Sequence, residues 1–167
     1  FDWLEDALRA LGVTVWPMVD LEADDGLASA ATVAAADPRV DQVVICTPDK
    51  DLGQCVGGKI VQLDRRQNKL IDADGVVEKF GVTAESIPDW LALVGDSADG
   101  FPGLPGFGAK STAALLARYR HLEDIPPEAA DWEVPVRGAP KLAATLVAQR
   151  ADADLFKVLA TLRTDGA

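Results

Sequence analysis

Seven acidic residues fall into three short groups whose side chains could bind divalent metal ions. The groups are Glu22/Asp24/Asp25, Asp49/Asp51 and Asp96/Asp99. Hard cations such as Mg²⁺ and Mn²⁺ prefer carboxylate oxygens as ligands, and clustered carboxylates repel each other unless cations lie among them. Two such cations about 4 Å apart can activate water and stabilise the oxygens of an in-line phosphoryl displacement. The three groups therefore predict a metal centre for phosphodiester hydrolysis.

A glycine- and proline-rich stretch follows the last acidic group and predicts a phosphate-binding hairpin. It reads Gly103-Leu104-Pro105-Gly106-Phe107-Gly108 and opens onto a helix-forming run with Lys110 in its first turn. Free N–H groups and the positive end of the dipole make a helix start suitable for phosphate. Gly106 and Gly108 have no side chain to block a close approach, and Lys110 adds a point charge. The alternative is that these glycines only shape a tight turn between helices.

The sequence offers little for covalent or redox chemistry. His121 is the single histidine, and with no partner motif around it we interpret it as a capping or surface residue. Cys46 and Cys55 do not form a disulfide framework, so we expect both to be reduced and structural. No apolar run approaches the roughly 20 residues of a membrane span. These features favour a cytoplasmic protein.

The elements around the acidic groups indicate an α/β fold. The apolar run 42–47 predicts a buried parallel strand that ends directly before Asp49 and Asp51, and ligands bind beyond the carboxyl ends of such strands. An ordinary solvated turn is the alternative for these two residues. Glu22, Asp24 and Asp25 begin an alanine-rich helix that runs to about Ala36. Because acids in a first turn also stabilise the helix dipole, capping is the alternative for this group.

The remaining periodicity predicts short strands in the first part of the chain and helices in the second. Expected strands are 13–19, 59–63 and 69–71; expected helices are 1–11, 75–80, 86–94, 109–119, 140–150 and 152–162. The chain is therefore predicted to divide into an α/β part over residues 1–95 and a helical part over residues 96–167. Asp96 and Asp99 would belong to the metal centre although they lie in the second part.

The net charge of −11 at first argues against a nucleic-acid partner, but its distribution is uneven. Residues 1–99 carry 19 acids against 8 bases, whereas residues 100–167 carry 8 of each. Cations bound among the clustered acids would cancel much of the negative charge. The composition therefore permits a DNA-binding surface in the second part.

At this point the sequence resembles the 5′-nuclease family, which includes the 5′→3′ exonuclease domain of bacterial DNA polymerase I and the flap endonucleases. Four motifs carry the resemblance, in the family's order and spacing. They are Glu22-Ala23-Asp24-Asp25, Thr47-Pro48-Asp49-Lys50-Asp51-Leu52, Gly95-Asp96-Ser97-Ala98-Asp99, and Gly103-Leu104-Pro105-Gly106-Phe107-Gly108-Ala109-Lys110-Ser111-Thr112. Each motif alone is weak, but four in order are specific.

The resemblance implies a PIN-like (resolvase-like) parallel sheet core followed by a helix-hairpin-helix region. It implies two or more Mg²⁺ or Mn²⁺ ions held by Glu22, Asp24, Asp25, Asp49, Asp51, Asp96 and Asp99, with Asp24, Asp25, Asp49, Asp51 and Asp99 as the catalytic set. The hairpin would bind K⁺ through the backbone of Leu104 and Phe107. Gly106, Gly108, Lys110 and Ser111 would contact DNA phosphates.

The implied protein is a monomeric bacterial enzyme of the cytoplasm and nucleoid that cleaves 5′ flaps, nicks or duplex 5′ ends during DNA replication and repair. Family members begin with a strand and basic helices that this sequence lacks, so we expect an N-terminal part to be missing. Two alternatives remain open: a catalytically inactive DNA-binding module, and a PIN-type ribonuclease.

Overall fold

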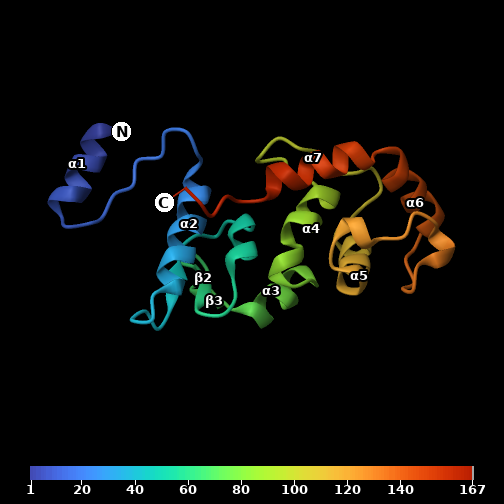
Figure 1. Ribbon diagram of the computed structural model, residues 1–167, viewed down its shortest axis with the longest axis horizontal. Coiled ribbons are helices and arrows are strands. Elements are labelled where there is room, and N and C mark those ends of the chain that lie inside the picture. Colours follow the sequence, from blue (N-terminus) through green and yellow to red (C-terminus); the bar gives the residue numbers. More distant parts are fainter. Residues whose placement is uncertain (167) are drawn as a thin grey trace.

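The computed structural model describes residues 1–166 as an elongated chain, with an N-terminal helix at one end, a small sheet next to it, and most of the helices toward the other end (Figure 1). The sheet contains β1 (Val43–Ile45), β2 (Ile60–Asp64) and β3 (Lys69–Ile71), in that order. β1 and β2 are parallel, and β2 and β3 are antiparallel. The sheet is therefore mixed, because a turn as short as residues 65–68 can join only antiparallel strands.

Helix α2 (Ala23–Ala36) packs against β1 and the 3₁₀ helix η1 (Asp51–Cys55). Its small inward residues allow a close approach, and Ala31, Ile45 and Leu52 form a compact buried cluster. The expected strand over 42–47 is shorter in the structure: β1 ends at Ile45, two residues before the predicted end, and an irregular segment leads from there to Asp49 and Asp51. The small core thus fixes both α2 and η1 near the end of β1.

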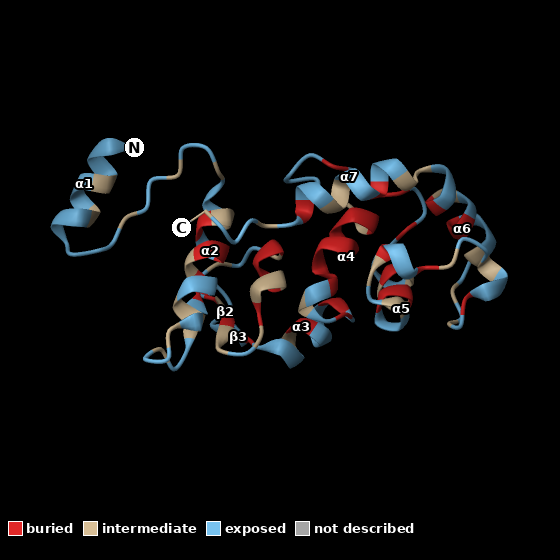
Figure 2. Cartoon of the chain, in the orientation of Figure 1, coloured by how far each residue is buried: buried red, intermediate tan, exposed pale blue. Residues whose placement is uncertain are grey.

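The larger core lies among the helices. It joins α3 (Ala73–Phe80), α4 (Ile87–Val94), α5 (Ala109–Tyr119), α6 (Ala139–Ala148) and α7 (Arg150–Ala160). Helix α4 is buried over nearly its whole length and packs against both α5 and α7 (Figure 2). Its Leu91 and Leu93 are fully buried, as is Leu115 of α5. Burying one leucine side chain contributes about 2 kcal/mol, so α4 is the main apolar anchor of this half.

Short 3₁₀ helices complete the connections: η2 (Ala84–Ser86), η3 (Leu122–Asp124) and η4 (Ala129–Asp131). Most predicted helices are present with ends shifted by one or two residues. Helix α3 starts at Ala73 because the Asp72 side chain accepts the Gly75 N–H at 2.9 Å, and it stops at Gly81 with φ +74°. Such side-chain and glycine caps set helix ends locally.

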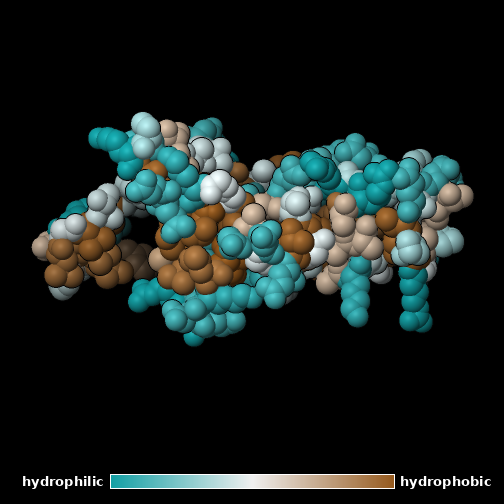
Figure 3. Space-filling model, turned by 90° about the horizontal axis from the view of Figure 1, so that it is seen from below, coloured by the Kyte–Doolittle hydropathy of each residue, from teal (hydrophilic) through white to brown (hydrophobic). Residues whose placement is uncertain are grey.

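The first part of the chain departs from expectation. Helix α1 (Asp2–Ala10) forms as predicted, but none of its residues is buried, and the expected strand over 13–19 is not formed. A strand needs a neighbour for its backbone N–H and C=O groups, and the sheet of residues 1–166 does not pair with this segment. Apolar side chains therefore gather at this end of the surface, where Trp3, Trp16 and Val19 are exposed (Figure 3).

Within residues 1–166, no helix is both long enough and apolar enough to span a membrane.

Candidate metal centre and hairpin

Two of the predicted acidic groups meet in the structure. Asp51 is the first residue of η1, whereas Asp96 and Asp99 lie in the loop after α4. One carboxylate oxygen of each lies within 4.8 Å of the others. Asp51 and Asp96 are buried and Asp99 is exposed, so the cluster opens toward solvent on one side. Residues 45 positions apart thus form a single oxygen-rich site.

A buried glutamine fixes the segment between β1 and η1. Gln62, on β2, is 1% exposed, and its amide donates to the carbonyl oxygen of Thr47 at 3.0 Å and to that of Asp49. The Asp49 carboxylate in turn accepts the backbone N–H of Asp51 at 3.2 Å. The parallel pairing of β1 with β2 therefore sets the position of both aspartates.

The loop that carries Asp96 is closed by its own backbone. Asp96 N–H donates to Phe101 O at 2.9 Å, and Phe101 N–H donates to Asp96 O at 3.0 Å. Two glycines let this loop lie against the end of α4. A Cβ on Gly95 would be 2.4 Å from Pro102 O, and a Cβ on Gly103 would be 2.4 Å from Gly95 N. Both glycines have positive φ, so backbone contact positions Asp96.

In the third acidic group, Glu22/Asp24/Asp25, the structure relates only Asp24 to this site. Burial raises the pKa of Asp24, and the next contributions come from the charges of Asp49 and Asp99, so the Asp24 carboxyl lies near enough to the cluster for its charges to act on it. Asp25 instead accepts the backbone N–H of Glu22 at 3.2 Å and that of Arg163 at 2.8 Å. Asp25 thus caps α2 and holds the C-terminal segment. A metal-binding role for Glu22 and Asp25 stays a prediction.

The electrostatics of the cluster favour a bound cation. Burial, followed by the neighbouring Asp99 carboxyl, raises the pKa of Asp51 to about 8. Burial also opposes ionisation of Asp96, but hydrogen bonds from Lys50 and from the backbone N–H of Ala98 outweigh it and lower the pKa of this carboxyl. Like charges that are confined in a partly buried site raise one another's pKa when too little positive charge is present, as the raised pKa of Asp51 shows.

The donor set fits a hard divalent ion. Asp51 Oδ1 is buried and has no hydrogen-bond partner among the described residues. A buried polar oxygen without a partner carries a free-energy penalty that a cation would remove. The ligand types are all carboxylate oxygens, as Mg²⁺ and Mn²⁺ prefer. Asp51, Asp96 and Asp99 could therefore hold one ion directly, with Asp24 and Asp49 next to them.

The predicted hairpin follows the same loop and leads directly into α5. Leu104 and Phe107 are buried, and Leu104 N–H donates to Leu93 O at 2.9 Å, which fixes the hairpin to α4. Gly106 has φ +91° and is exposed at the tip. Nothing lies within 4 Å of a Cβ built on Gly108. The hairpin thus presents open backbone to solvent.

The start of α5 is only partly free to bind a ligand. The Ser111 hydroxyl accepts the Gly108 N–H at 3.1 Å and donates to the Gly108 carbonyl at 3.0 Å, so it serves as a local cap. The Lys110 side chain is exposed, beside the positive end of the helix dipole. Lys110 is therefore the charge of this surface best placed to meet a phosphate.

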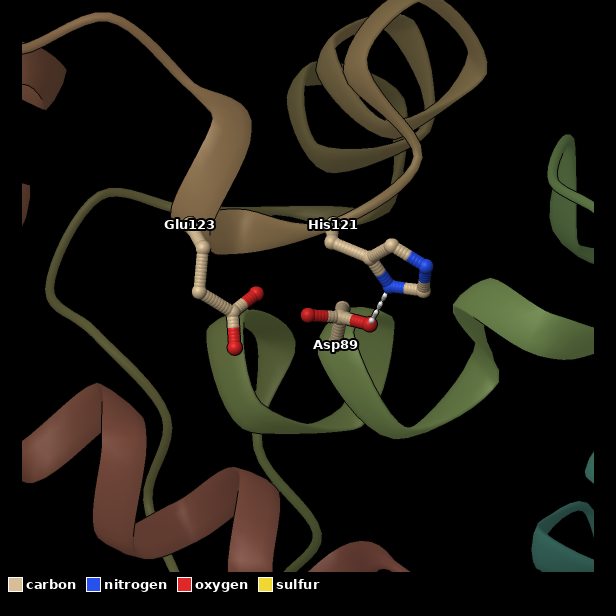
Figure 4. Close-up of side chains that lie close together, drawn as sticks. All are labelled: Asp89, His121 and Glu123. Carbon is tan, nitrogen blue, oxygen red and sulfur yellow. Dashed lines mark hydrogen bonds and ion pairs between the residues drawn. The ribbon is translucent and has the colours of Figure 1, made fainter.

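A second cluster of ligand-type side chains lies among the helices, formed by Asp89, His121 and Glu123 (Figure 4). Asp89 is fully buried on α4 and accepts the Leu122 N–H at 2.9 Å, and His121 Nδ1 lies 3.0 Å from its other oxygen. Lys157 Nζ lies 2.8 Å from both Asp89 and Glu123. Because this ammonium occupies the cation position, the cluster is a structural junction of α4, η3 and α7.

Replacing Asp89 with Ala should lower the free energy of unfolding by about 3 kcal/mol, because it leaves the Leu122 N–H and the Lys157 charge without their buried partner. Glu123→Ala is the matched control, since the Glu123 side chain is 51% exposed and its loss should cost below about 1 kcal/mol. Urea unfolding of both variants measures the difference. Equal losses would contradict the structural role of Asp89.

Sequence reasoning missed two residues of the site, Lys50 and Gln62. It gave Lys50 no role of its own, although a basic residue between two acids that are predicted to bind metal is a signal that the sequence shows. Gln62 was also missed, and its only signal is an amide within an otherwise apolar strand. His121, interpreted from the sequence as a capping or surface residue, precedes η3 and is half-buried, with its Nδ1 3.0 Å from Asp89.

Comparison with known families covers the whole chain. Residues 1–81 match the family described as 5′-3′ exonuclease, N-terminal resolvase-like domain, and residues 82–167 match 5′-3′ exonuclease, C-terminal SAM fold. These matches confirm the predicted fold class, a resolvase-like α/β core followed by a helical region.

Individual relatives agree. DNA polymerase I of Pseudomonas aeruginosa is 41% identical over 170 residues, which cover 97% of this chain and 18% of that protein. A 5′-3′ exonuclease of Aquifex aeolicus is 32% identical over 162 residues, covering 97% of this chain and 52% of that protein. The chain thus spans about half the length of one relative and less than a fifth of the other.

Solved structures show the same fold. T5 5′-exonuclease with bound zinc has a TM-score of 0.78 at 22% identity, over 98% of this chain and 59% of that chain. The bacteriophage T5 D15 flap endonuclease, in a complex with DNA and metal ions, has a TM-score of 0.75 at 20% identity, over 96% and 57%. Taken with the two family matches, these similarities show that the chain belongs to the 5′-3′ exonuclease family.

Proposed function

We propose that this chain forms part of a metal-dependent, structure-specific 5′ nuclease that hydrolyses DNA phosphodiesters near a 5′ end or flap. The observation that carries the proposal is the cluster of Asp51, Asp96 and Asp99, with the unpaired buried oxygen of Asp51, beside the loop of Asp96 and Asp99 that continues into the hairpin. A metal site and a phosphate surface are then joined by only a few residues of backbone. The names of the Aquifex and T5 proteins, an exonuclease and a flap endonuclease, support the same chemistry.

The residues divide into two roles. Asp24, Asp49, Asp51, Asp96 and Asp99 hold Mg²⁺ or Mn²⁺, and Glu22 and Asp25 border the site. Bound divalent ions supply an activated water and stabilise charge on the phosphate oxygens. Gly106, Gly108, Lys110 and Ser111 meet duplex phosphates, and the backbone of Leu104 and Phe107 holds K⁺. The protein works as a monomer on chromosomal DNA in bacterial replication and repair.

The proposed part over residues 1–95 carries Asp24, Asp49 and Asp51, and the proposed part over residues 96–167 carries Asp96, Asp99 and the hairpin. The loop after α4 links them, because it carries two of the metal-site acids and ends in the hairpin. A groove of about 400 Å³ borders the hairpin, and its lining includes Pro105 and Gly106 of the hairpin, Gln149, and Asp152 of α7. Because the hairpin and two of the acids belong to one loop, DNA bound at the hairpin would be kept at a fixed distance from the acids.

Cleavage of a 5′-labelled flap substrate by the full-length protein tests the proposal. We expect short 5′ products in Mg²⁺ or Mn²⁺ and none in EDTA, with far less cleavage of a matched RNA. Flap binding without cleavage in any divalent metal would contradict the nuclease proposal and favour an inactive DNA-binding module. Preferred cleavage of RNA would favour the PIN-type ribonuclease instead.

The hairpin role predicts a defined effect of removing Lys110. Lys110→Ala in the full-length protein should weaken binding to any duplex-containing flap and lower the slope of log affinity against log salt by roughly one unit, as one phosphate contact is lost. Lys79→Ala, on the exposed face of α3, is the control. The measurement is equilibrium binding in Ca²⁺ across a KCl series. An unchanged affinity and slope for Lys110→Ala would refute its phosphate contact.

A further inference from the structure

Lys50 places a positive charge inside the acidic cluster. Its Nζ donates to Asp96 Oδ2, and it lies 4.0 Å from Asp51 Oδ1. That Asp51 oxygen is the buried atom that has no hydrogen-bond partner. The ammonium thus sits between two of the three carboxylates that could hold a metal ion.

Within residues 1–166, Asp51 and Asp96 form ion pairs with Lys50 and with no other basic side chain. The side chains of Asp96 and Asp51 are only 4% and 9% exposed, so the charge of Asp96, and that of Asp51 when it ionises, is weakly screened and needs a partner. Lys50, at 32% exposed, keeps a path to solvent. Its flexible four-carbon stem lets the charge move away without moving the backbone.

We propose that Lys50 is an internal counter-ion that occupies the cation position between Asp51 and Asp96, and that a divalent ion displaces it on binding. The inference rests on the metal centre proposed above and adds a residue that sets its affinity. Ion and ammonium use the same carboxylate oxygens, so they compete. Lys50 lowers the affinity for metal and holds the carboxylates together while the metal is absent.

Because Lys50 and the metal ion compete, replacing Lys50 should raise the affinity for metal and lower the stability of the metal-free protein. Lys50→Met, in the full-length protein, should bind Mn²⁺ roughly three- to tenfold more tightly, because no ammonium has to be displaced. The same variant should melt at a lower temperature in EDTA, since the acids then repel without a counter-ion, and Mn²⁺ should restore the wild-type melting temperature. Lys50→Arg should keep the low metal affinity.

Mn²⁺ titration, followed by the electron paramagnetic resonance signal of the free ion, measures the affinity. Asp51→Asn identifies which binding belongs to this cluster. Lys59→Met is the matched control, because Lys59 is also half-buried but donates to the Asp37 carbonyl, away from the acids. It should leave Mn²⁺ affinity unchanged.

The outcomes separate the two proposals. If wild-type protein binds Mn²⁺ at the cluster but Lys50→Met binds it equally or more weakly, Lys50 is not a competitor and the counter-ion role is overturned while the metal centre stands. If neither binds Mn²⁺ in a way that Asp51→Asn abolishes, the metal centre fails and the counter-ion role fails with it.

Discussion

Asp51→Asn in the full-length protein is expected to lower single-turnover cleavage of a 5′-flap substrate by about 10²- to 10⁴-fold, while affinity for the flap in Ca²⁺ changes little. Asp51 combines burial with an unpaired oxygen and lies at the centre of the cluster. Asn keeps the shape but removes the charge that holds a cation, which corresponds to about 3 to 5 kcal/mol of barrier. Asp49→Asn should act in the same direction.

The matched control is Asp74→Asn, an exposed acid of α3 away from the cluster. It should cleave at the wild-type rate. A near-normal rate for Asp51→Asn would remove this residue from the catalytic set, and a parallel loss of flap affinity would show that its effect is not confined to the chemistry.

Gly103→Ala should be among the most destabilising single-methyl substitutions in the chain, lowering the free energy of unfolding by about 3 to 5 kcal/mol. Its φ is +69°, and a Cβ would meet backbone atoms of Gly95, Val94 and Leu93 at 2.4 to 2.7 Å. Backbone atoms cannot rotate away as side chains do, so overpacking adds to the cost of left-handed φ. The Asp96 loop would be displaced from the end of α4.

Substitutions at two other glycines of the same stretch separate the cost of a left-handed φ from the cost of overpacking against the backbone. Gly100 has φ +83° but open space around its Cβ position, so Gly100→Ala should lose only about 1 to 2 kcal/mol. Gly108 has φ −127° and open space, so Gly108→Ala should be nearly neutral for folding. Denaturant unfolding of the three variants gives the order. Equal losses for Gly100→Ala and Gly103→Ala would show that the close approach does not matter.

Local signals in the sequence predicted the helical half well. Helix α5 has the predicted bounds, because Gly108 precedes a run of strong helix formers and the chain leaves helical geometry at Arg120, where φ is +66°. The existence of β1 was also predictable from the apolar run before Pro48, although the strand ends at Ile45, two residues earlier than expected. These features depend on neighbours in sequence.

Tertiary features were less accessible. The segment 13–19 has strand-like composition, but strand formation depends on a pairing partner that composition does not reveal. Spacing alone could not show that Asp24 lies near the cluster while Asp25 caps α2 and holds Arg163. The burial of Asp89 beneath Lys157 depends on α4 meeting α7, which are more than fifty residues apart. Contacts of this range follow from packing rather than local pattern.

The central claim is that acids from η1 and from the loop after α4 form one divalent-metal centre, and anomalous X-ray scattering from Mn²⁺-soaked crystals of the full-length protein tests it most directly. The account predicts a Mn²⁺ peak bounded by the carboxylates of Asp51, Asp96 and Asp99, on the side near Asp24, with Lys50 Nζ withdrawn from Asp96. The peak should disappear in Asp51→Asn crystals. Well-ordered wild-type crystals with saturating Mn²⁺ and no peak at these carboxylates would contradict the account.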